Sequence, residues 1–242
     1  MMRRTVLVPQ VLVPPVLVLL AGGLLAGCAA DPGSAGGCGT GAGDRAGEAG
    51  FAEVLALSAP TADYAWYPET VTAALPSVTY TGEGVGDGHG SELAAVGRFT
   101  GWEPGEPDHP ARAMIDLTFA VDEVVDALGD LTMLEGATVT VHVGVDGCAD
   151  VDRVAEELLG LDDLVLFLDH VGPEPWPPPE WVIGFDGAFL GDVHGDGAIT
   201  WPVADAIAAN NAADHHPETD AGTLEDLRAA AAEERTVELC TD

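Results

Sequence analysis

Between residues 93 and 201 the chain repeatedly alternates apolar and polar positions, which predicts a domain built mainly of strands. The clearest stretch runs from Ile115 to Val121, where every second residue is apolar, as in a strand with one buried face. Residues 139–145 follow the same pattern and residues 93–102 follow it less regularly. Residues 164–168 form a continuous apolar run, which suits a buried strand.

Residues 181–201 divide into shorter strand fragments at two Asp-Gly pairs, Asp186-Gly187 and Asp196-Gly197. Such pairs favour hairpin turns, because both central positions tolerate a positive φ. With the preceding segments they make five or more strands at short spacing, which predicts a small barrel or sandwich. Three prolines after a tryptophan, Trp176–Pro179, predict an exposed extended loop.

One helix is predicted between two of the strands. Residues 151–159 carry apolar side chains at positions i, i+3, i+4, i+7 and i+8, the spacing of a helix with one buried face. Asp150 is placed to cap its beginning and Gly160 to end it.

A second helix is predicted near the end of the chain. Thr223 and Asp226 have the spacing of a capping box, and helix-forming residues continue to about Glu234. A weaker pattern predicts a third helix over residues 69–75. The predicted fold class is therefore mainly β with short helices (α+β), with one helix inserted between strands and one at the C-terminus.

The first 28 residues have the pattern of an export signal. Two arginines precede an apolar run without charged residues, Val6–Leu25, which ends in the sequence Leu25-Ala26-Gly27-Cys28. This ending resembles the lipobox of bacterial lipoproteins. The resemblance implies that Cys28 becomes the new N-terminus and carries the lipid. The chain would then be anchored in the bilayer, lipid-linked, at the extracytoplasmic face of the cell membrane.

An uncleaved transmembrane helix is the alternative for this segment, since about 20 apolar residues can just span a bilayer. Three prolines, Pro9, Pro14 and Pro15, and the pair Gly22-Gly23 weaken such a helix. The pair Arg3-Arg4 also resembles a twin-arginine signal. Both export routes therefore stay open.

These patterns divide the chain into three parts. Residues 1–27 are predicted to be a signal peptide, 28–50 a Gly/Ala-rich tether, and 51–242 a single β-rich domain. The tether contains no bulky apolar side chain, so it cannot bury enough surface to fold.

The charge of the chain excludes several functions. Its 242 residues include 41 Asp and Glu but only 8 basic residues, all of them arginine, giving a formal net charge of −33. Without lysine there can be no P-loop lysine and no Schiff base. Nucleic acid is excluded as a partner, because phosphate backbones are bound by neutralising them with basic side chains.

One local motif resembles the calcium loops of EF-hand and dockerin proteins. Asp192, His194 and Asp196 occupy its first, third and fifth positions, and a glycine follows at the sixth. Histidine is a poor calcium ligand, and Val203 stands at position 12, where an acidic ligand belongs. A polar Asp-Gly hairpin is the alternative. Calcium is the one cofactor that the sequence suggests.

The sequence favours a binding domain over an enzyme. No Gly-x-Ser-x-Gly nucleophile motif occurs. Ser91, which follows His89-Gly90, is a weak nucleophile candidate without the required strand-turn-helix pattern. The pair His215-His216 lacks the spacing of a zinc site.

Three cysteines remain once Cys28 carries a lipid: Cys38, Cys148 and Cys240. An odd number in an exported chain allows one intramolecular bridge. We predict a disulfide between Cys148 and Cys240, because both lie within or beside the folded part. Cys38 with Cys240 is the competing pair.

The order of strands and inserted helix over Leu93–Cys240 is similar to small barrels of the OB type, including netrin-like and metalloproteinase-inhibitor-like domains. The resemblance implies a five-stranded barrel. In those domains an N-terminal cysteine contacts a protease metal through its free amine, whereas Cys28 would be acylated.

The function expected from the sequence is that of an exported, membrane-anchored lipoprotein without a specific predicted activity. Its domain is expected to bind a protein or an envelope component without catalysing a reaction. The alternatives are an inhibitor-like barrel that acts on an extracellular protease and a cation-binding module.

Overall fold

The computed structural model describes residues 50–58, 70–82, 85–107, 112–170, 180–184, 187–210 and 218–238. All of them belong to the second of two compact units, Met1–Ala35 and Gly36–Asp242. The predicted signal peptide, the tether up to residue 49 and the Trp176–Pro179 loop lie outside the described residues. Among the helices that are described, none is long and apolar enough to cross a membrane.

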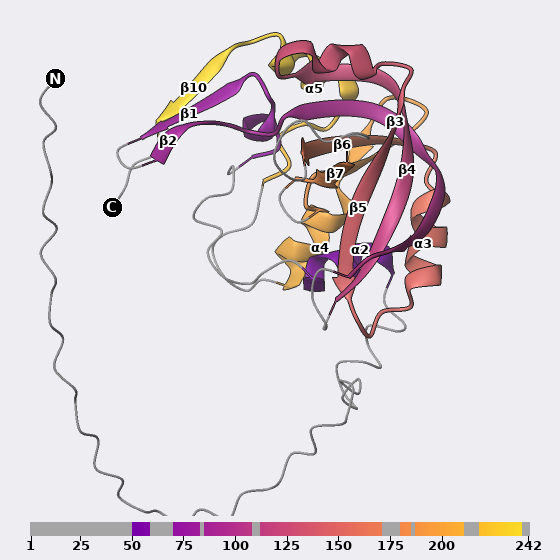
Figure 1. Cartoon of the computed structure of the whole chain (residues 1–242). Helices are drawn as coiled ribbons and strands as arrows, with labels where there is room; N and C mark the ends of the chain where they lie inside the picture. Colours follow the sequence, from indigo (N-terminus) through magenta and orange to yellow (C-terminus); the bar gives the residue numbers. More distant parts are fainter. Residues whose placement is uncertain are drawn as a thin grey trace, which may run out of the picture. The chain divides into compact units, whose positions relative to one another are not determined.

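Five strands form a closed barrel (Figure 1): β3 (Leu93–Gly105), β4 (Arg112–Ala127), β5 (Thr138–Asp146), β6 (Asp163–His170) and β7 (Glu180–Ile183). β3 pairs with β4 and β4 with β5, both antiparallel, and β5 pairs with β7 in parallel. β7 then pairs with β6, and β6 closes the barrel by pairing with β3. This confirms the predicted small barrel of OB-like type.

Apolar side chains from every barrel strand fill the interior. They include Leu93, Phe99, Ile115, Leu117, Phe119, Val141, Leu166, Trp181 and Ile183. β3 approaches β4 closely at Gly97, where a Cβ would overlap the carbonyl oxygen of Ala120. The period-two pattern of the sequence therefore corresponds to alternation between the barrel interior and its outer surface.

The predicted inserted helix is confirmed as α3 (Val151–Leu159), between β5 and β6. The carboxylate of Asp150 accepts the amide of Arg153 at 3.2 Å and so caps the helix. Val154, Ala155 and Leu158 are buried in the same core as the barrel interior.

Further strands extend the barrel on one side. β8 (Leu190–Val193) pairs with β6, and the short β9 (Ile199–Thr200) pairs with β8. A separate sheet has the order β10-β1-β2, formed by β10 (Arg235–Glu238), β1 (Val78–Gly82) and β2 (Val85–His89). Val78 of this sheet packs in a second core with side chains on the outer surface of β3 and β6.

Three more α-helices and two 3₁₀ turns complete the described fold: α2 (Phe51–Ser58), α4 (Pro202–Asn210), α5 (Leu224–Ala231), η2 (Thr72–Ala74) and η3 (Gly129–Leu134). In Figure 1, α2 and α4 lie together at the lower end of the barrel. The β10-β1-β2 sheet extends from the upper part of the domain to the left.

Two helix predictions need correction. The helix expected over residues 69–75 is only the 3₁₀ turn η2, because Pro76 forces Leu75 into an extended conformation with ψ 145°. The predicted helix after Thr223 is confirmed as α5, but it ends at Ala231 instead of about Glu234, and β10 begins at Arg235. There the Arg235 amide donates to the carbonyl of Ser77 at 3.3 Å, so pairing with a distant segment overrides helical preference.

Candidate functional site

The predicted calcium motif forms the turn between β8 and β9. The amide of His194 donates to the carbonyl of Ala198 at 2.8 Å, and Gly197 has a φ of +83°. The carboxylate of Asp196 accepts the Ala198 amide at 3.1 Å. These contacts are those of a polar Asp-Gly hairpin.

The side chains of the motif are engaged with one another. His194 Nδ1 lies 4.0 Å from an Asp192 carboxylate oxygen, and His194 Nε2 lies 3.3 Å from the Thr200 hydroxyl. In the part of the chain that the structure describes, no group of three or more His, Cys, Asp or Glu side chains is placed to hold a metal ion. Calcium binding by Asp192, His194 and Asp196 stays a prediction.

Two residues of this turn line a surface hollow of about 540 Å³. Three segments far apart in the sequence form its wall: β3, the connection from α3 to β6, and the β8–β9 turn. The lining residues are Arg98, Gly160, Leu161, Asp162, Asp163, Asp192, Val193, His194 and Gly195. Its volume lies within the range of ligand pockets, roughly 300–1,000 Å³, and the hollow is open to solvent.

The lining of the hollow is predominantly acidic. Three carboxylates, those of Asp162, Asp163 and Asp192, line it together with one guanidinium and one imidazole. The guanidinium of Arg98 also lies 3.8 Å from the carboxylate of Asp122. The net charge of the wall is therefore negative, which favours a ligand with a positive group.

A second polar cluster crosses the outer surface of the barrel. Asp116 on β4 and His142 on β5 are register partners, and their side chains are 2.7 Å apart and about one fifth exposed. Val182 on β7 is the register partner of both His142 and Asp169 on β6. One row across four strands thus carries an Asp-His pair and a further carboxylate.

The carboxyl group of Asp169 is the most perturbed acid of this row. Burial raises its pKa to about 6, with a further contribution from the charge of Glu92. The backbone amide of Glu92 acts in the opposite direction, because it donates a hydrogen bond to the carboxylate. The sequence shows the polar positions of this row, but their alignment depends on strand register and could not be predicted.

The weak nucleophile candidate is inaccessible. The Ser91 side chain is 1% exposed, and its hydroxyl has no hydrogen-bond partner. Its amide donates to the carbonyl of Ala74 at 2.8 Å, which keeps it below η2. His215 and His216 lie outside the described residues.

Cys148 lies in the turn between β5 and α3 and is disulfide-bonded. Cys28, Cys38 and Cys240 lie outside the described residues. The pairing of Cys148 with Cys240 and the lipidation of Cys28 therefore stay predictions.

Comparisons with known proteins add no family to this description. No protein-family model, no curated protein and no solved structure matches the chain.

Proposed function

We propose that this chain is an exported lipoprotein, anchored through Cys28 at the extracytoplasmic face of the membrane, whose barrel domain binds a partner. The lipobox-like sequence Leu25–Cys28 supports the anchor. The barrel interior is filled by its own side chains. Binding is therefore assigned to the outer surface of the domain.

The observation that carries the binding role is the acidic hollow lined by Arg98, residues 160–163 and residues 192–195. Its volume of about 540 Å³ greatly exceeds the roughly 30 Å³ that one water molecule occupies in the liquid. A basic side chain of a protein partner fits this size and charge better than a bare ion does. The hollow would act as an anchor pocket for an arginine or lysine of that partner.

A charge-matched pair of variants tests the site. One carries Asp162→Asn, Asp163→Asn and Asp192→Asn; the control carries Glu135→Gln, Glu233→Gln and Glu234→Gln, which are exposed positions outside the hollow. The probe is a short peptide with two arginines, measured by isothermal titration calorimetry at about 0.15 M salt, where long-range charge effects are screened.

We expect the hollow variant to weaken peptide binding at least tenfold and the control to weaken it less than threefold. Equal weakening by both variants would mean that the peptide responds only to overall charge. That result would remove the hollow as the site. A separate titration with calcium tests the cation-binding alternative.

A further inference from the structure

We infer that the disulfide partner of Cys148 is Cys38. The bridge would then link the segment before α2 to the turn between β5 and α3. Cys148 is disulfide-bonded, and the chain offers three possible partners, Cys28, Cys38 and Cys240. The inference rests on the proposed function in one respect, because there the sulfur of Cys28 carries the lipid. The choice is then between Cys38 and Cys240.

Cys240 follows a strand that begins near one end of β4. The amide of Arg235, the first residue of β10, donates to the carbonyl of Ser77 at 3.3 Å. The amide of Ser77 in turn donates to the carboxylate of Asp126 at 2.8 Å, next to the last residue of β4. The start of β10 is therefore fixed at the C-terminal end of β4.

Cys148 lies at the opposite end of that strand. Arg112, the first residue of β4, is the register partner of Asp146, whose carboxylate accepts the amide of Cys148 at 2.8 Å. From Arg112 to Asp126, β4 follows a path of roughly 46 Å at about 3.3 Å per residue. The curvature of the barrel shortens the direct distance but leaves the two sites at different ends.

The remaining chain does not favour a return from β10 to Cys148. From Arg235 to Cys240 a fully extended chain covers at most about 17 Å. β10 runs parallel to β1, from Val78 towards Thr81, and Figure 1 shows its arrow pointing away from the barrel. β10 thus leads away from the turn between β5 and α3.

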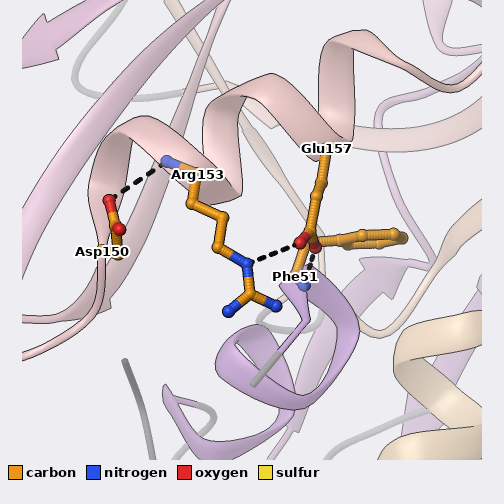
Figure 2. Close-up of polar contacts among 4 residues, drawn as sticks. All are labelled: Phe51, Asp150, Arg153 and Glu157. Atoms are coloured by element: carbon orange, nitrogen blue, oxygen red, sulfur yellow. Dashed lines mark hydrogen bonds and ion pairs between the residues drawn. The ribbon is translucent and has the colours of Figure 1, made fainter. Parts of the chain in front are cut away.

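The start of α2, in contrast, lies beside the helix that follows Cys148. Figure 2 shows the amide of Phe51, the first residue of α2, donating to a carboxylate oxygen of Glu157 on α3 at 2.7 Å. The cap of α3, Asp150, comes two residues after Cys148. From Asp150 to Glu157 the helix rises only about 10 Å.

Cys38 is within reach of the start of α2. Twelve peptide steps separate it from Gly50, and a chain of that length can reach at most about 41 Å when fully extended. A disulfide needs Cα atoms within about 7 Å of each other. The number of residues before Gly50 therefore allows Cys38 to reach Cys148, and the inference leaves Cys240 as the free thiol.

The bridge would shorten the free part of the tether. Without the bridge, 22 peptide steps separate Cys28 from Gly50, the first described residue; with it, ten steps separate Cys28 from the linked Cys38. In forming the S–S bond the two thiols lose two protons and two electrons to a disulfide oxidant, which becomes two thiols. Oxidation thus shortens the stretch of sequence that links the proposed lipid anchor to the domain.

Tryptic digestion of the non-reduced full chain tests the pairing, because cleavage after arginine separates the three cysteines. Cys38 falls in the peptide that ends at Arg45, Cys148 in Ala113–Arg153 and Cys240 in Thr236–Asp242. After alkylation of free thiols, mass spectrometry should find the first two peptides linked and the third alkylated. A link between Thr236–Asp242 and either of the other peptides would overturn the inference.

Two serine variants separate this inference from the lipid assignment. Cys38→Ser should remove the link, while Cys240→Ser, the matched control, should leave it in place. A link that persists in Cys38→Ser and disappears in Cys28→Ser would overturn both the inference and the lipid anchor. A link to Cys240 would overturn the inference alone.

Discussion

At the scale of single residues, the carboxyl group of Asp169 lies in an environment that disfavours its charged form. It lies against Gly184, where a Cβ would come within 2.7 Å of a carboxylate oxygen. Burial and the charge of Glu92 raise its pKa from 3.8 to about 6. The folded state therefore holds this proton more tightly than the unfolded chain does.

This difference predicts a pH-dependent effect of Asp169→Asn. The proton on Asp169 makes its full contribution to the free energy of unfolding below about pH 4. This contribution is lost as the pH rises through about 6. The neutral variant should be more stable than the wild type at pH 8 by roughly 2 kcal/mol, and the difference should vanish near pH 4. Urea unfolding at the two pH values measures it.

The control is Asp163→Asn at the exposed first position of the same strand. It changes the net charge equally, so it reports the general effect of charge on stability. An equal gain in both variants at pH 8 would contradict the assigned cost of burying Asp169.

At the scale of elements, one side chain of α3 supports the start of α2. Glu157 accepts the amide of Phe51 at 2.7 Å and the Nε of Arg153 at 2.8 Å (Figure 2). Helix beginnings leave amides without intrahelical partners, and this carboxylate satisfies one of them from another helix. The first turn of α2 is therefore fixed to α3.

Replacing this side chain should loosen α2. Glu157→Ala removes the acceptor for Phe51 and should lower the free energy of unfolding by about 1 kcal/mol, while Glu157→Gln, which keeps an acceptor, should cost less. The neighbouring Glu156 is exposed, so Glu156→Ala is the matched control in the same urea titration. An equal loss in the two alanine variants would contradict the supporting role of Glu157.

Local signals explain which elements could be predicted. The caps at Asp150 and Thr223 locate α3 and α5, because their hydrogen bonds lie within three residues. β10 could not be predicted, since its stability depends on pairing with β1, more than 150 residues earlier in the chain. α4, for which no helix was predicted, begins at Pro202, and proline suits the first helical position.

At the scale of the whole molecule, the barrel fold and the acidic composition could be predicted from the sequence. The position of the acidic hollow could not. Alternation from Ile115 to Val121 indicates a strand with one buried face, and several such strands imply a barrel. The hollow depends on three distant segments meeting, which no local pattern encodes. Asp192 and His194 were recognised as a calcium motif, whereas Arg98, Asp162 and Asp163 carried no signal.

The proposed lipid at Cys28 is the central feature of the whole molecule, because it would place the barrel at the membrane surface and give the predicted tether a role. Incorporation of labelled palmitate by cells expressing the full chain tests this most directly. We expect the label in the wild type, its loss in Cys28→Ala, and its retention in Cys38→Ser. A wild-type chain that takes up no palmitate, or equal labelling of Cys28→Ala, would contradict the account.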